Sequence, residues 1–127
     1  MTELVAKAFL ALAVVEADAL LVAFDERADY RSPNFLWFRD RFDRFVYVDR
    51  VVVAAYARGR GLARALYLQL FARARDAGHD TVVAEVNVDP PNPGSHAFHA
   101  AMGFRAVGSA TLTGDKRVRY YARTLAG

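Results

Sequence analysis

The chain has 127 residues, with a hydrophobic fraction of 54 % and a charged fraction of 24 %, as expected for one globular domain over residues 1–127. The formal net charge of +3 suits an anionic small-molecule ligand, but it is too weak and too scattered to predict a nucleic-acid surface. The absence of cysteine excludes disulfides, thiolate nucleophiles and cysteine-ligated metals.

The first apolar stretch, residues 6–15, does not have the pattern of a signal peptide. Glu3 accompanies Lys7 ahead of it, and the apolar character resumes beyond residue 19. Glu16 and Asp18 interrupt the stretch, whereas a membrane span needs about 20 uninterrupted apolar residues. We therefore expect a cytoplasmic protein with no membrane partner.

Two short apolar runs, residues 9–15 and 20–24, predict an antiparallel hairpin, although residues 4–12 are also compatible with an alanine-rich helix. Residues 25–44 then combine charges with many aromatic side chains. Ser32-Pro33-Asn34 predicts the start of a short helix that carries Phe35, Phe38 and Phe42 on one side. This segment is expected to pack over one end of the sheet or to form one wall of the acceptor pocket, and both can be true together.

Residues 47–78 are the unit around which the chain is organised. Residues 47–53 are β-branched and aromatic and predict a buried strand. A glycine turn follows, and then a helix that ends at Gly78, a natural C′ residue. The apolar stripe predicted for this helix consists of Leu62, Ala65, Leu66, Leu70 and Ala74.

A strand that leads through a glycine turn into a helix N-terminus is suited to bind an anion. The first N–H groups of a helix have no intrahelical partner, and the helix dipole adds positive potential there. Gly59 and Gly61 allow a ligand to approach the backbone. The turn matches neither a Walker loop nor the dinucleotide-binding G-x-G-x-x-G, because Arg64 stands at the position of the third glycine.

Residues 81–88 predict a second buried strand, which should run parallel to the first because a helix connects the two. Strand alternation places Val83, Glu85 and Asn87 on one of its faces. A proline-rich turn follows, and a short helix over residues 95–102 is capped by Asn92 or Ser95. Strands over residues 104–108 and 118–125, with a turn at Gly114-Asp115, complete the predicted elements.

Two motifs resemble those of the GCN5-related N-acetyltransferases, the GNAT superfamily. The first is Arg58-Gly59-Arg60-Gly61-Leu62-Ala63, similar to the family's R/Q-x-x-G-x-G/A loop. The second is Asn92 followed by Phe98-His99 and Gly103-Phe104, similar to the family's Leu-Tyr-x-x-x-Gly-Phe, with His99 at the position of the tyrosine. The resemblance covers roughly residues 14–125 and is strongest over residues 47–104.

The resemblance implies an α/β fold: a single-domain GNAT (acyl-CoA N-acyltransferase) domain with a mixed twisted sheet and flanking helices, shortened at the N-terminus. It also implies acetyl-CoA as co-substrate and direct transfer of the acetyl group to a primary amine of a small molecule or peptide. The alternatives are a non-catalytic acyl-CoA-binding regulatory module and an acyltransferase that uses a different acyl-CoA. The cofactor-binding residues implied are Val51, Val52, Val53, Arg58, Gly59, Arg60, Gly61, Leu62, Ala63, Asn92, Phe98 and His99.

Direct transfer requires a base for the amine and an acid near the sulfur. Glu85 lies in an apolar strand, which should raise its pKa toward neutrality, although pairing with an arginine is the alternative. Asp49 is the rival base, with Arg50 as its alternative partner. His99 replaces the tyrosine that in many relatives protonates the departing thiolate; it could act as acid or base or only bond the sulfur, and the alternative is a solvent-facing helix histidine.

Two expectations concern partners. His79 and His96 pair with no carboxylate at metal-ligand spacing in the sequence, so no metal site is predicted. The resemblance also implies that the short N-terminal region leaves the acceptor side without part of its usual wall. Residues 30–45 or a second subunit would then supply it, which favours a homodimer.

Overall fold

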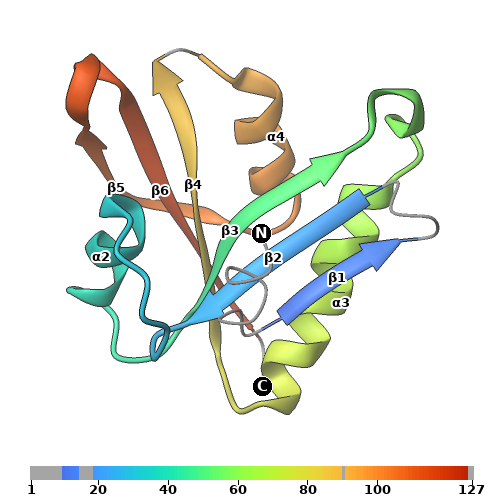
Figure 1. Ribbon diagram of the computed structural model, residues 1–127, viewed down its shortest axis with the longest axis horizontal. Coiled ribbons are helices and arrows are strands. Elements are labelled where there is room, and N and C mark those ends of the chain that lie inside the picture. The colour runs from blue at the N-terminus through green and yellow to red at the C-terminus, as the bar shows by residue number, and fades with distance from the viewer. Residues whose placement is uncertain (1–9, 15–18, 90, 126–127) are drawn as a thin grey trace.

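The computed structural model describes residues 10–14, 19–89 and 91–125. These residues form one six-stranded sheet in the order β1-β2-β3-β4-β6-β5, with helices on both faces (Figure 1). The strands are β1 (Leu10–Val14), β2 (Ala19–Asp25), β3 (Val46–Val53), β4 (Thr81–Asp89), β5 (Arg105–Thr111) and β6 (Arg117–Thr124). The α-helices are α2 (Pro33–Arg39), α3 (Leu62–Asp76) and α4 (Pro93–Ala101), and short 3-10 turns span Ala55–Ala57 and Thr113–Asp115.

The central strands β3 and β4 are parallel, as the connecting helix predicted, and they pair over a very short length. Their register is Val46 with Val82 and Tyr47 with Val83, and no further pairs follow in the described part of the chain. Figure 1 shows the two strands diverging toward their carboxyl ends. All other neighbouring strands described here run antiparallel. The sheet therefore opens between β3 and β4.

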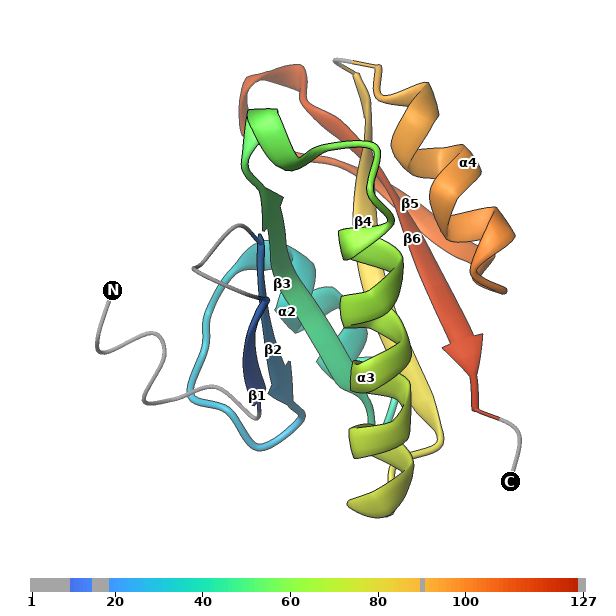
Figure 2. The ribbon, with the colours of Figure 1, turned by 90° about the vertical axis from the view of Figure 1, so that its right-hand side faces the viewer.

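One face of the sheet is covered by α3 and α4 (Figure 2). The buried side of α3 carries Leu66, Leu70 and Ala74, as predicted, but Ala65 is exposed and the predicted stripe is wrong at that position. Tyr67 and Phe71 are buried in its place. The buried stripe is rotated toward these aromatic rings because they pack against Phe104, whose ring centroid lies 5.8 Å from that of Tyr67 and 6.1 Å from that of Phe71.

The other face is covered by α2 and its neighbouring loops. Ser32 caps this helix by accepting a hydrogen bond from the Phe35 amide at 3.1 Å, as expected for serine before Pro33. Phe35 and Phe38 are fully buried on the sheet, and Phe42 packs beside them. The predicted position of the aromatic segment over the sheet is therefore confirmed.

The N-terminal strands form the predicted antiparallel hairpin, with Leu10 opposite Ala23 and Val14 opposite Ala19. Residues 10–12 are strand, so the alternative helix over residues 4–12 is wrong there. The predicted shortening of the fold falls on residues 1–9, which lie outside the described residues. No helix in the described ranges is long and apolar enough to cross a membrane.

A bulge in β3 changes which of its side chains face α3. Val48 pairs with Ala23 and Arg50 pairs with Val22, so Asp49 has no opposite residue on β2. The extra residue shifts the alternation by one position: Val46 and Val48 face the α3 side before the bulge, and Val51 and Val53 face it afterwards. The bulge therefore places a carboxylate where the two central strands part.

Gly108 gives a test of the packing between α2 and β5. A Cβ at this position would overlap the Trp37 ring, which is stacked on Tyr120 at a centroid distance of 4.1 Å and covered by the Arg41 guanidinium at 4.0 Å. We predict that Gly108→Ala lowers the free energy of unfolding by about 1–3 kcal/mol, because the ring has little room to move. Urea denaturation measures the change.

The matched control is Gly94→Ala, where an added Cβ meets nothing within 4 Å. A Trp37→Leu background should abolish most of the cost of Gly108→Ala. Equal costs in both backgrounds would show that the overlap with Trp37 is not the cause.

Candidate active site

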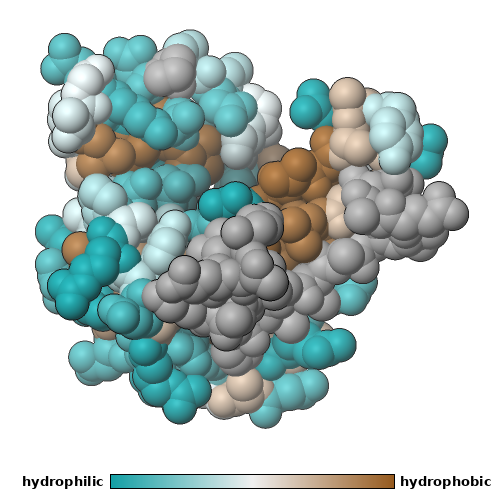
Figure 3. Space-filling model, viewed as in Figure 1, coloured by the Kyte–Doolittle hydropathy of each residue, from teal (hydrophilic) through white to brown (hydrophobic). Residues whose placement is uncertain are grey.

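A pocket of 510 Å³ opens where β3 has separated from β4. Its walls are the carboxyl half of β3, the glycine turn, and the first turns of α3 and α4. Figure 3 shows the molecular surface hollowed between the part carrying β4 and α4 and the part carrying the end of β3, with hydrophobic residues on the β3 side. The lining residues are Val51, Val52, Val53, Ala57, Arg58, Gly59, Gly61, Leu62, Ala63, Arg64, Tyr67, Gly94, Ser95, Phe98 and His99.

The glycine turn exposes backbone donors to this pocket. Gly59 and Gly61 have φ angles of 82° and 74°, which are in the left-handed region that favours glycine. Gly61 is the N-cap of α3 and offers no side chain to its first N–H groups. An added Cβ at either glycine would meet nothing within 4 Å, so the approach to these amides is open. The turn can therefore hold a phosphate group.

Most of the residues predicted to bind the cofactor line this pocket, and two do not. Arg60 is exposed outside the lining, and Asn92 is the N-cap of α4, accepting a hydrogen bond from the Ser95 amide at 3.3 Å. Arg64 also lines the pocket. Tyr67 also lines the pocket, and it was not predicted from the sequence. The signal was its spacing: it follows the predicted contact Ala63 by four residues, so both lie on one side of α3.

A second pocket of 160 Å³ adjoins the first between β3 and β4. The two share Val51, Tyr67, Ser95 and His99. The small pocket also contains both predicted bases, Glu85 and Asp49. The structure thus joins a pocket suited to bind an anion to a carboxylate-lined pocket through a common boundary.

Glu85 is partly buried beside Tyr47, whose hydroxyl donates a hydrogen bond to its Oε1 at 2.7 Å. Burial raises the pKa of Glu85 from 4.5 to about 7, and the hydrogen bond from Tyr47 opposes this rise. In the described part of the chain, no basic side chain lies within ion-pair distance of Glu85. The alternative of a structural pair with an arginine therefore does not hold.

Asp49 has the partners that its structural alternative required. Its side chain is 6 % exposed, accepts a hydrogen bond from the Tyr30 hydroxyl at 2.6 Å, and forms an ion pair with Arg50 at 2.9 Å. Burial and the bond to Asp49 raise the pKa of Tyr30 to about 12, so this hydroxyl stays protonated. Both oxygens of Asp49 are thus engaged, in contrast to those of Glu85.

His99 is buried, with 6 % exposure, so the alternative of a solvent-facing histidine is wrong. Its Nδ1 lies 2.8 Å from the Ser95 carbonyl oxygen, and its Nε2 lies 2.9 Å from the Tyr67 hydroxyl. Burial lowers the pKa of His99, which favours the neutral ring. His96 instead joins α4 to the sheet, through Tyr121 at 2.6 Å and the Asn87 carbonyl at 2.9 Å.

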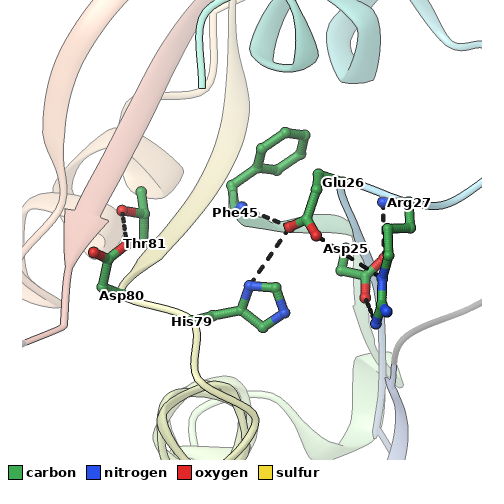
Figure 4. A network of polar contacts seen from close by, with 7 residues as sticks. All are labelled: Asp25, Glu26, Arg27, Phe45, His79, Asp80 and Thr81. Carbon is green, nitrogen blue, oxygen red and sulfur yellow. Dashed lines mark hydrogen bonds and ion pairs between the residues drawn. The ribbon is translucent and has the colours of Figure 1, made fainter. Parts of the chain in front are cut away.

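His79 lies among carboxylates at the opposite end of the sheet (Figure 4). Ligand atoms of Asp25, Glu26 and His79 lie within 4.8 Å of one another, and His79 Nδ1 is 3.6 Å from Glu26 Oε1. The same oxygen accepts the Phe45 amide at 3.0 Å, and Arg27 bonds both oxygens of Asp25. The sequence missed this cluster because residue 79 is remote from residues 25 and 26 in the chain, and the absence of a metal stays a prediction.

A family model described as Acetyltransferase (GNAT) family matches residues 28–104, more than half of the chain. The chain belongs to the GNAT family. This membership confirms the resemblance that the glycine turn and α4 predicted.

Among the relatives of this GNAT protein, an "N-acetyltransferase" from Streptomyces griseus is 38 % identical over 82 residues, which cover 61 % of this chain and 41 % of the relative. A solved structure described as an acetyltransferase has a TM-score of 0.70 at 19 % identity. The match covers 91 % of this chain and 69 % of the solved chain. NAA60 of Arabidopsis thaliana in complex with acetyl-CoA has a TM-score of 0.66 at 17 % identity, covering 88 % and 68 %. The solved structures confirm the GNAT fold.

The raised pKa of Glu85 predicts how stability depends on pH. Between pH 4.5 and about 7 the unfolded chain loses the Glu85 proton while the folded chain retains it, so stability falls as the pH rises through this window. Glu85→Gln removes this term. We predict that the variant gains on the order of 2 kcal/mol relative to the wild-type protein between pH 5 and pH 8.

Urea denaturation of both proteins at the two pH values measures this gain. Glutamine keeps the size of the side chain and an acceptor for Tyr47, so packing is preserved. A difference between variant and wild type that is the same at both pH values would contradict the raised pKa.

Proposed function

We propose that this GNAT protein transfers the acetyl group of acetyl-CoA to a primary amine of a small molecule or peptide, by direct attack of the amine on the thioester. The observation that carries the proposal is the common boundary of the two pockets. The larger pocket offers unpaired backbone donors and arginines, and the smaller one offers a carboxylate that titrates near neutral pH.

The larger pocket suits the parts of acetyl-CoA. The first amides of α3, together with Arg58 and Arg64, would bind the diphosphate, because they combine backbone N–H groups with positive charge. The backbone of Val51–Val53 has no β4 partner and is free to bond the amide groups of the pantetheine arm. Arg60 and Asn92 remain predicted contacts from the family resemblance, although neither lines the pocket.

The smaller pocket suits the amine. A primary amine is mostly protonated at neutral pH and must lose a proton before it can attack. Glu85, with its pKa of about 7, is well matched to accept that proton. Asp49 is less suitable because Tyr30 and Arg50 already occupy its oxygens. The neutral amine then attacks the thioester carbon, and the thiolate departs.

Two alternatives make different demands on the site. A regulatory acyl-CoA-binding module would have no use for a buried carboxylate beside the cofactor pocket, so Glu85 favours the enzyme. A different acyl group would have to fit between Val51 and Tyr67, at the boundary of the pockets. A homodimer stays a prediction from the sequence.

Calorimetric titration with acetyl-CoA tests the cofactor pocket. We predict binding that weakens by about 1–3 kcal/mol in Arg58→Ala, the scale of lost charge-assisted hydrogen bonds. Arg75→Ala, an exposed arginine at the far end of α3, is the matched control and should bind like the wild-type protein. No heat of binding and no competition by CoA would contradict the proposed function.

A thiol-release assay with a panel of primary amines tests the base. We predict that Glu85→Gln lowers kcat roughly 10²- to 10⁴-fold, the usual contribution of a general base. In the wild-type protein, kcat should rise with pH through an apparent pKa near 7. The loss of kcat in Asp49→Asn, compared with the loss in Glu85→Gln, shows which carboxylate is the base. Each variant must first be shown to bind acetyl-CoA. A larger loss in Asp49→Asn would make Asp49 the base.

A further inference from the structure

Tyr67 lies at the boundary between the two pockets and lines both. It belongs to the second turn of α3, directly after the turn that leads from the glycines. Its ring is fixed by edge contacts with Phe98 and Phe104, at centroid distances of 5.4 Å and 5.8 Å, and the residue is 2 % exposed. Its hydroxyl is therefore held where a cofactor in one pocket would meet an acceptor in the other.

The hydrogen bonds of His99 determine which of the two side chains holds a transferable proton. The Ser95 carbonyl can only accept a hydrogen bond, so His99 Nδ1, at 2.8 Å, carries the hydrogen. The neutral ring then has no hydrogen on Nε2, which accepts from the Tyr67 hydroxyl at 2.9 Å. Burial lowers the pKa of His99 and so opposes a second proton on the ring. The hydrogen between the two side chains therefore belongs to Tyr67, and rotation about the Tyr67 C–O bond can turn it from His99 toward a ligand at the pocket boundary.

We propose that Tyr67 is the acid that protonates the departing CoA sulfur, and that His99 is a positioning residue that orients the Tyr67 hydroxyl. This assignment rests on the proposed function and deepens it. It differs from the sequence prediction, in which His99 itself takes the place of the family's tyrosine. The tyrosine is supplied instead by α3, from the opposite side of the pocket boundary.

Glu85 takes the first proton, from the ammonium group, and the neutral nitrogen attacks the thioester carbon. When the carbon–sulfur bond breaks, its electron pair stays on sulfur, and Tyr67 Oη passes its proton to that sulfur. The nitrogen must lose one more proton to become a neutral amide, and this proton restores the Tyr67 hydroxyl.

These two proton transfers, from Tyr67 to sulfur and from nitrogen to Tyr67, require a tyrosine that is rarely ionised. Burial, and after it the nearby Glu85 carboxylate, hold the pKa of Tyr67 above its usual value. The hydroxyl therefore stays protonated until a strong acid, the positively charged nitrogen of the intermediate, is available to replace its proton. Sulfur and nitrogen are bonded to the same carbon in that intermediate, so one hydroxyl at the pocket boundary can serve both.

The test uses bound CoA and needs no acceptor. A hydroxyl that donates to sulfur stabilises the thiolate, so it lowers the pKa of the bound thiol. We expect the thiolate-to-thiol ratio of bound CoA at fixed pH to fall roughly 10- to 100-fold in Tyr67→Phe, the scale of a hydrogen bond to a charged group. Ultraviolet absorption of the thiolate, titrated with pH at saturating CoA, gives the ratio.

Tyr120→Phe is the matched control, because Tyr120 is also a buried tyrosine, its hydroxyl donates to Asn34 at 2.9 Å, and it lies outside both pockets. Its thiolate ratio should equal that of the wild-type protein. With an accepted amine, Tyr67→Phe should lower kcat and leave KM for acetyl-CoA nearly unchanged. His99→Gln, which retains an acceptor for the Tyr67 hydroxyl, should lose less activity than His99→Ala.

The outcomes separate this proposal from the proposed function. A Tyr67→Phe variant that binds CoA with an unchanged thiolate ratio overturns the role of Tyr67 and leaves acetyl transfer intact. A larger fall of the ratio in His99→Ala than in Tyr67→Phe makes His99 the donor and also overturns it. A wild-type protein that does not bind CoA overturns the proposed function itself. Thermal melts of each variant exclude unfolding as the cause.

Discussion

The early end of pairing between β3 and β4 is the constraint on which the rest of the site depends. Beyond Tyr47 and Val83, the two strands cannot satisfy one another's backbone groups. These groups would be costly to bury without partners. An opening between the strands leaves them accessible to a ligand, and both pockets form along that opening. The carboxylates at its edge are Glu85 from β4 and Asp49 from the bulge in β3.

Aromatic packing on the α2 face stabilises this opened arrangement. Tyr47 connects the two strands through its bond to Glu85, and its ring lies 5.6 Å from Phe35 and 5.9 Å from Phe38. The proposed base, Glu85, is therefore oriented by a side chain that is itself fixed in the core. On the other face, the bonds of His96 to Tyr121 and to the Asn87 carbonyl hold α4 against the sheet. The orientation of Glu85, and the position of the helix that carries His99, are thus set by aromatic side chains packed behind the site.

The sequence predicted those features that are encoded within one element or between consecutive elements. The strands, the glycine turn and the cap of α4 follow from residue types at short spacing, and the family motifs join them into a fold. The partnerships of the site side chains could not be predicted in this way. Tyr67 with His99, Tyr30 with Asp49 and His79 with Glu26 connect residues that are distant in sequence. Their meeting depends on the register of the sheet and on the rotation of α3, which periodicity alone placed wrongly at Ala65.

The short pairing of β3 with β4 also determines how the two halves of the sheet are held together. The chain contains two antiparallel blocks, β1-β2-β3 and β4-β6-β5, and only two residue pairs connect their backbones in the part of the chain described. The blocks are held together mainly by the side chains of α2, which lies within the first block in sequence, and of α3, which connects the two. Few backbone bonds therefore hold the two walls of the candidate site together, since the site lies at the boundary at which the two blocks meet. The distance between those walls depends on how α2 and α3 pack against both blocks.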